Sequence, residues 1–156
     1  MSSILKLIIS IALCFFVAFL GSWATFQSVQ TWYMTINKPS FNPPSWLFGP
    51  VWSVLYTLMA IAFWLVWKNR DLPSKSFAMQ LFLIQLVLNL LWSFLFFYFK
   101  LPFWAFLEII LMWTTILFTI IYFYKINPWA AYIMIPYLLW VGFATLLNGS
   151  IWILNS

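Results

Sequence analysis

The chain contains no histidine, and Asp71 and Glu108 are its only carboxylate side chains. A zinc site, a Ser-His-Asp triad and a pair of carboxylates working as acid and base cannot be assembled from these residues. The four glycines are isolated along the chain, so a glycine-rich phosphate-binding loop is missing as well. The sequence therefore predicts no metal site and no conventional hydrolytic or phosphoryl-transfer activity.

Charge and cysteine are also scarce. Only 6% of the 156 residues are charged, whereas a soluble domain carries roughly a quarter. With 66% hydrophobic residues, the chain cannot cover a water-facing surface, so we expect a lipid bilayer around it. The net charge of +5 comes from single Lys and Arg residues, a pattern that indicates membrane anchoring and topology rather than nucleic-acid binding. The single cysteine, Cys14, excludes an internal disulfide.

Five apolar segments are each long enough to cross a membrane, which takes about 20 mostly apolar residues. Polar or proline-containing breaks separate them, and most of the connections are so short that consecutive helices must be antiparallel. We predict an all-α integral membrane protein with a single transmembrane domain over residues 1–156: a five-transmembrane-helix bundle with a structured loop between its first two helices. The predicted spans are about 4–27, 44–68, 74–99, 101–125 and 127–153.

The first segment also has the features of a secretory signal peptide, with Lys6, an apolar run and the small residues Ser22 and Ala24. Its apolar length is closer to a full span than to the short core of a signal peptide, so we favour a retained helix. Most of the cations then fall on the N-terminal side: Lys6, Lys68, Arg70, Lys75 and Lys125, against Lys38 and Lys100 on the other. By the positive-inside rule, we expect a cytoplasmic N-terminus and the 28–43 loop outside.

Aromatic residues make up 24% of the chain, more than the belts at the two membrane surfaces require. Three of the predicted helices carry aromatic and polar residues along one face, at helical spacing. Chain direction places these faces together, mostly in the outer half of the membrane and beneath the 28–43 loop. They comprise Phe48, Trp52 and Tyr56 in the second helix, Asn89, Trp92, Ser93 and Phe96 in the third, and Tyr137, Trp140, Ala144 and Asn148 in the fifth.

A side-chain amide in lipid is costly unless it is paired, so Asn89 and Asn148 should face the bundle interior. They could serve only to hydrogen-bond neighbouring helices. Alternatively, they could belong to a ligand pocket with flat apolar walls, a few convergent polar groups and a lid. The indoles and tyrosine hydroxyls on the same faces favour the pocket. The proline-rich, aromatic segment 31–43 is suited to be its stiff cover, although it could simply shield helix ends.

Glu108 is the one carboxylate inside a predicted span. Because the spans hold no cationic partner for it, we favour a protonated carboxyl that is hydrogen-bonded at a helix contact, over a role in proton coupling. Cys14, Ala18 and Ser22 form a stripe of small residues on the first helix. This stripe fits close internal packing and a homodimer contact equally well.

Several motifs carry a resemblance to a known family. They are Trp32-Tyr33, Lys38-Pro39-Ser40, Pro43-Pro44, Trp46, FGPVW at 48–52, Tyr56, QLVLNLLWSFLFF at 85–97 and NPWAAYIMIPYLLWVGFATLLN at 127–148. Together, and in this order over essentially the whole chain, they resemble the translocator protein family. The family is also called TspO/MBR, tryptophan-rich sensory protein or peripheral benzodiazepine receptor.

The resemblance implies a five-helix bundle, often a homodimer, whose cavity is lined by the first, second, third and fifth helices and closed by the first loop. It also implies binding of porphyrin and haem, and, in animal members, of cholesterol and benzodiazepine-site drugs. We expect the cytoplasmic membrane of a bacterium as the location. Matching positions imply ligand contacts by Tyr33, Trp52, Asn89, Trp92, Trp140, Ala144 and Asn148; the faces and the loop add Trp32, Pro43, Trp46, Tyr56, Ser93 and Phe96.

The sequence departs from the family at Phe94, where proline is common, and in its C-terminal SIWILN, which lacks the Tyr and Arg of the animal cholesterol motif. Sterol binding is therefore not supported. Without histidine, conventional axial ligation of haem is excluded, so we expect protoporphyrin or haem to bind as a ligand by packing, with no obligatory cofactor.

The expected function is tetrapyrrole binding with a sensory, regulatory or transport role. The alternative is light-dependent porphyrin degradation through Trp52 and Trp140, which match the tryptophans that the resemblance links to that reaction. A secondary transporter has less support, because inverted repeats and paired ionisable groups are missing from the spans.

Overall fold

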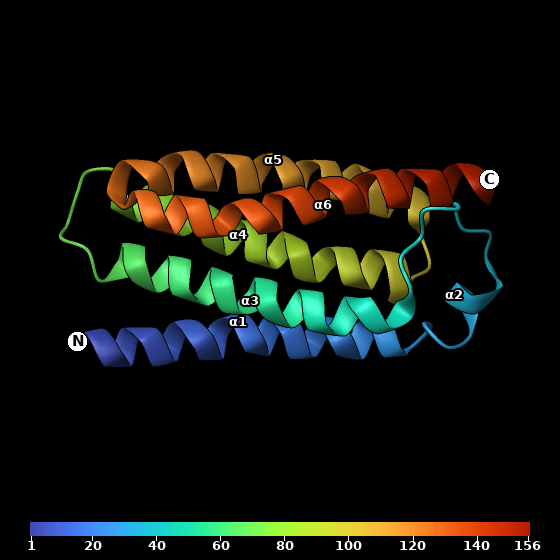
Figure 1. Cartoon of the computed structure of the whole chain (residues 1–156), viewed down its shortest axis with the longest axis horizontal. Coiled ribbons are helices and arrows are strands. Elements are labelled where there is room, and N and C mark those ends of the chain that lie inside the picture. Colours follow the sequence, from blue (N-terminus) through green and yellow to red (C-terminus); the bar gives the residue numbers. More distant parts are fainter.

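The computed structural model describes all 156 residues, and every regular element in it is helical (Figure 1). A single-turn helix, α2 (Trp32–Thr35), lies in the loop between the first two long helices. Both ends of each predicted span lie within one residue of the corresponding helix ends in the structure, which confirms the five-helix membrane bundle. The five long, apolar helices are α1 (Ser3–Phe26), α3 (Ser45–Trp67), α4 (Lys75–Ser93) continued by η1 (Phe94–Tyr98), α5 (Pro102–Ile126) and α6 (Pro128–Leu154).

Local residues account for where several helices begin. The side chains of Ser2 and Asn127 accept hydrogen bonds from backbone N–H groups in the first turns of α1 and α6. Pro102 and Pro128 occupy the first turns of α5 and α6, where a backbone N–H is not needed. Lys100, with φ 57°, adopts the left-handed conformation in the tight connection that leads into α5.

The long helices alternate in direction, so the bundle has an N-terminal end and an opposite end, called here the loop end, which carries α2 and the C-terminus (Figure 1). α5 packs against α4 and α6, while α1 packs against α3 and α4. The bundle is solid near its N-terminal end, where Phe82 stacks between Phe63 and Phe123 with ring centroids 4.7 and 5.9 Å away. α5 and α6 also pack closely at Gly149, where the absence of a side chain makes room for Phe106. A Cβ at this position would lie only 2.8 Å from the Phe106 ring.

The segment η1 is a π-helical extension of α4 at the loop end. The N–H of Phe99 donates to the carbonyl of Phe94 at 2.8 Å, five residues earlier. Such segments add one residue to a turn and are frequent at functional sites. Here Phe96 turns toward the bundle interior, whereas Tyr98 stacks on Trp23 of α1 at 5.6 Å. Phe94 is the first residue of this segment.

The loop between α1 and α3 is fixed first against η1. The Ser28 hydroxyl donates to the carbonyl of Phe97 at 2.6 Å. Tyr33 is buried, and its ring lies 6.2 Å from that of Phe96 and 5.5 Å from that of Phe97. The stiff, aromatic start of the loop is thereby part of the packed structure, as predicted.

A second set of contacts joins the loop to the end of α6. The N–H of Asn37 donates to Oδ1 of Asn155 at 2.9 Å, and the Asn155 amide donates back to the Asn37 carbonyl at 2.8 Å. The Lys38 ammonium donates to the carbonyls of Tyr33 and Ile36 at 2.7 and 3.1 Å, which terminates α2. The loop therefore crosses from α1 to the C-terminal end of α6 before it returns to α3 (Figure 1).

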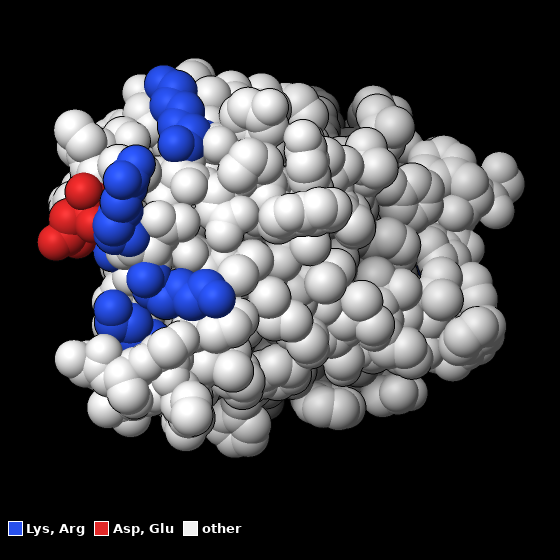
Figure 2. Space-filling view, turned by 60° about the vertical axis from the view of Figure 1, so that its left-hand side comes forward, with Lys and Arg blue, Asp and Glu red and all other residues white.

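Cationic residues that are far apart in the sequence gather at the N-terminal end of the bundle (Figure 2). Lys75 makes the only salt bridge, 3.4 Å from Asp71. The Lys68 ammonium lies 4.1 Å from the centroid of the Trp64 ring. The cations at this end are Lys6, Lys68, Arg70, Lys75 and Lys125.

Candidate functional site

A cavity of about 610 Å³ lies in the loop-end half of the bundle. This volume is within the range of ~300–1,000 Å³ that is usual for small-molecule sites. Its walls come from α1, α3, α4 with η1, α6 and the first residues of the loop, and nearly half of the lining residues are aromatic. α5 contributes no residue to the lining. The loop-end halves of four helices therefore enclose a hollow, whereas side chains fill the N-terminal half of the bundle.

Most of the predicted site residues come together in this cavity. Among those that do not, Trp32 packs on the Phe96 ring at 5.7 Å, Pro43 lies in the returning part of the loop, and Trp46 is 72% exposed at the start of α3. The loop reaches the cavity only through Val29, Gln30 and Tyr33, because its later part runs along the end of α6. The predicted residues that line the cavity are Tyr33, Trp52, Tyr56, Asn89, Trp92, Ser93, Phe96, Trp140, Ala144 and Asn148.

The α1 wall was not predicted residue by residue. Phe15, Ala18, Phe19, Ser22 and Phe26 all line the cavity. These positions follow the i, i+3, i+4, i+7, i+11 spacing of one helical face, and the stripe of small residues already contained two of them. The sequence did not separate internal packing from a dimer contact for this stripe, and the structure shows Ala18 and Ser22 facing a hollow.

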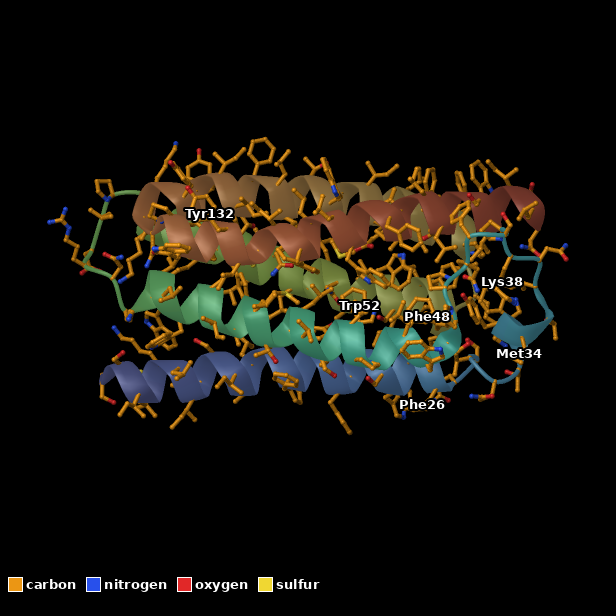
Figure 3. The ribbon with its side chains drawn as sticks, in the orientation of Figure 1. Phe26, Met34, Lys38, Phe48, Trp52 and Tyr132 are labelled. Atoms are coloured by element: carbon orange, nitrogen blue, oxygen red, sulfur yellow. The ribbon has the colours of Figure 1, made fainter.

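The mouth of the cavity lies between the loop-end halves of α1 and α3. Lining residues on both helices are solvent-exposed in the isolated chain, among them Ser22 and Phe26 on α1 and Gly49 and Ser53 on α3. The deeper lining residues Tyr56, Asn89 and Asn148 are buried. Figure 3 shows Phe26 at the end of α1 and Phe48 and Trp52 along α3, in the half of the bundle that holds the cavity.

Asn89 connects three helices at the base of the cavity. Its Oδ1 accepts a hydrogen bond from the Tyr56 hydroxyl at 2.7 Å, and its amide nitrogen donates to the Tyr137 hydroxyl oxygen at 2.7 Å. The Tyr137 hydroxyl in turn donates to Oε1 of Gln85 at 2.7 Å. The donor and acceptor of the Asn89 amide are thus each engaged by the protein, as burial in an apolar bundle requires.

Asn148 makes the second polar connection. Its Oδ1 accepts from the indole N–H of Trp92 at 2.9 Å, and its amide nitrogen donates to the Pro102 carbonyl at 2.9 Å. Both asparagines therefore face the bundle interior, as predicted. Hydrogen bonding between helices and a place in the cavity wall were two separate interpretations of these asparagines. Both apply, since each amide joins helices and also lines the cavity.

The two tryptophans expected at the centre of the site have free indole N–H groups. Trp52 packs beside Tyr56 at 5.7 Å, and Trp140 lies 6.1 Å from Phe48, but neither indole has a hydrogen-bond partner. Both rings line the cavity. They are therefore the aromatic donors that remain available to a ligand.

Tyr33 closes the cavity at the loop end. Its hydroxyl donates to Oδ1 of Asn42 at 3.1 Å, and the Lys38 ammonium lies 4.9 Å from its ring centroid. Burial raises the pKa of the Tyr33 hydroxyl above its usual value, although the hydrogen bond to Asn42 partly opposes this shift. Tyr33 is thus a neutral wall residue at physiological pH.

Glu108 lies outside the cavity, on α5. Its side chain is buried, and neither carboxyl oxygen has a hydrogen-bond partner. The predicted hydrogen bond at a helix contact is therefore wrong. Every other buried side-chain nitrogen or oxygen has at least one hydrogen-bond partner, so Glu108 is the exception in the bundle.

Comparison with known proteins gives one consistent result. A sequence model of the TspO/MBR family matches residues 10–153. The chain is 42% identical over 154 residues to a tryptophan-rich protein TspO of Archaeoglobus fulgidus, covering 99% of both chains. It is 35% identical over 136 residues to the translocator protein of Homo sapiens, covering 86% of this chain and 80% of the relative. A tryptophan-rich sensory protein of Cereibacter sphaeroides is 34% identical over 136 residues, with 85% and 84% covered.

Proposed function

The chain belongs to the TspO/MBR family of membrane proteins, and we propose that it binds tetrapyrroles of the porphyrin type in its aromatic cavity, in a sensory, regulatory or transport role. The observation that carries this proposal is a cavity of about 610 Å³ in which nearly half of the lining residues are aromatic. A porphyrin is a large, flat and mostly apolar π-system. Indole and phenyl rings suit such a body because aromatic rings pack favourably by stacking or edge to face.

The names of the relatives agree with a role in signalling or movement of a small molecule. One relative is called a translocator protein and another a sensory protein. Ligand binding is the step that both roles share. The cavity supports that step directly, whereas the buried Asn89 and Asn148 clusters keep its walls in place.

A binding titration with matched tryptophan variants tests this function. Purified protein in lipid nanodiscs is titrated with protoporphyrin, and binding is followed by the absorption shift of the pigment. We expect Trp52→Ala and Trp140→Ala to weaken binding by about fivefold or more, because each removes a wall ring worth about 1–3 kcal/mol to a stacked ligand. Trp104→Ala is the matched control, since Trp104 is exposed on α5, outside the cavity.

Equal affinities in all three variants would place the ligand elsewhere. Haem is the second probe in the same titration. Because the chain has no histidine, haem should bind within a few-fold of protoporphyrin and show no spectrum of ligated iron. Much tighter binding of haem, with such a spectrum, would contradict recognition by packing alone.

The free indoles of Trp52 and Trp140 favour a second candidate function, the light-dependent degradation of bound porphyrin. An illuminated porphyrin is a photosensitiser, and a cavity tryptophan can pass one electron to its excited state. This leaves a tryptophan radical and a porphyrin radical, and dissolved oxygen is the oxidant that then degrades the ring. The test is the decay of protoporphyrin absorbance under light in saturated samples of the protein. We expect Trp52→Phe and Trp140→Phe to slow this decay, and an unchanged rate in both variants removes the proposal.

A further inference from the structure

The lining of the cavity carries no charged side chain. None of the seven Lys and Arg residues and neither carboxylate belongs to it. The nearest candidate in the loop, Lys38, lies beside Tyr33 and donates to two backbone carbonyls (Figure 3). A buried carboxylate is costly without a cation or several hydrogen-bond donors. This cavity therefore has nothing that neutralises a negative charge at depth.

The neutral donors at depth are mostly engaged as well. The Asn89 and Asn148 amides, the Trp92 indole and the Tyr56 hydroxyl all donate to other protein groups. The donors that remain at depth are the indoles of Trp52 and Trp140, the Ser93 hydroxyl and the second N–H of each asparagine amide, and all of them are uncharged. These groups suit a neutral ligand atom better than a carboxylate.

Side chains near the mouth have a different character. Gln30 and Ser45 line the cavity, are exposed and make no hydrogen bond to the protein. Gln30 follows the end of α1, and Ser45 begins α3, so both stand at the loop end of the bundle. Water and lipid head groups can reach a ligand at this level.

We propose that the cavity recognises the uncharged tetrapyrrole ring, and that the carboxylates of a ligand remain at the mouth beside Gln30 and Ser45 and add little to affinity. The site should therefore bind neutral planar porphyrins as well as porphyrins that carry carboxylates. This inference rests on the proposed function and deepens it. It follows from the lack of charge in the lining, whereas the proposed function follows from its aromatic walls.

The test compares three ligands of the same ring size in the nanodisc titration: protoporphyrin, its dimethyl ester and an alkyl porphyrin without carboxylates. We expect the ester and the alkyl porphyrin to bind as tightly as the acid or within threefold of it. Trp140→Ala should weaken all three ligands by a similar factor. An ester or alkyl porphyrin that binds more than threefold more weakly than the acid overturns the inference.

Lys38→Gln supplies a second measurement, because Lys38 is the one cation next to a lining residue. We expect this variant to change the affinity for acid and ester by the same factor, whether or not it loosens the loop. Loss of affinity for the acid alone would assign a carboxylate to Lys38 and overturn the inference. If none of the three porphyrins binds above empty nanodiscs, the proposed function itself fails, which is a separate outcome.

Discussion

At the scale of single residues, Glu108 has the least favourable surroundings in the protein. Both of its carboxyl oxygens are buried without a partner, and an unsatisfied buried polar group costs about 1–3 kcal/mol. We therefore predict that Glu108→Leu raises the free energy of unfolding by about this amount. The measurement is thermal or denaturant unfolding of the purified protein in detergent.

Glu108→Gln is the control, because glutamine keeps a polar group of similar size at the same place. It should leave stability nearly unchanged. If Glu108→Leu instead destabilises the protein, the carboxyl has a partner that a single chain does not contain, such as a lipid or a second copy of the chain.

At the scale of helices, polar side chains fix how α3, α4 and α6 sit around the cavity. Asn89 of α4 accepts from Tyr56 of α3 and donates to Tyr137 of α6. We predict that Asn89→Leu destabilises the bundle by at least about 1 kcal/mol, since two interhelical bonds in membrane proteins contribute roughly 0.6 kcal/mol each. Unfolding in detergent measures the loss. Gln80→Leu is the matched control, an exposed amide on the same helix whose only bond is to Ser76.

A stability loss as large in Gln80→Leu as in Asn89→Leu would show that the interhelical hydrogen bonds of Asn89 do not stabilise the bundle. A double variant with Tyr56→Phe refines the result, because the two changes share one bond. Their combined effect should then be smaller than the sum of the separate effects.

The same elements show what sequence patterns could predict. Each span was placed to within one residue, because helix limits depend on local features such as Pro102 and Pro128. The cavity-facing stripes were also predicted, since a helical period and chain direction settle which faces meet. The partners of Asn89 and Asn148 were not, because they depend on how helices far apart in the sequence are rotated and shifted against each other. The position of Trp46 outside the cavity has the same cause.

The π-helical segment η1 was missed for a different reason. Its sequence, from Phe94 to Tyr98, is apolar and aromatic like the helix before it. Nothing in such a run distinguishes a turn with one extra residue from an ordinary turn. In the folded chain this segment contacts the loop, since Phe96 packs against Tyr33 and the Phe97 carbonyl accepts from the Ser28 hydroxyl, and such contacts between distant residues are not visible in a local sequence.

At the scale of the whole molecule, charge differs between the two ends of the bundle (Figure 2). Five cations lie at the N-terminal end, and only Lys38 and Lys100 lie at the loop end. Following the positive-inside rule, we predict that the N-terminal end faces the cytoplasm. Cysteine labelling can measure this in intact cells, because the single native cysteine, Cys14, is 0% exposed.

Met34→Cys places a thiol on the exposed surface of α2, and Pro73→Cys places one between α3 and α4. A membrane-impermeant maleimide added outside should label position 34 and leave position 73 unlabelled until the cells are opened. The reverse pattern contradicts the predicted orientation. Equal labelling of both would indicate a mixed topology.

The reciprocal amide contacts between Asn37 and Asn155 have a practical consequence for handling the protein. Asn155 caps the C-terminal end of α6, so the loop between α1 and α3 is fastened to that end of the helix. A purification tag or fluorescent partner joined directly to Ser156 would press on this fastening, whereas one joined to Met1 would sit at the far end of the bundle (Figure 1). Ligand affinities measured with tags at the two termini are therefore not interchangeable.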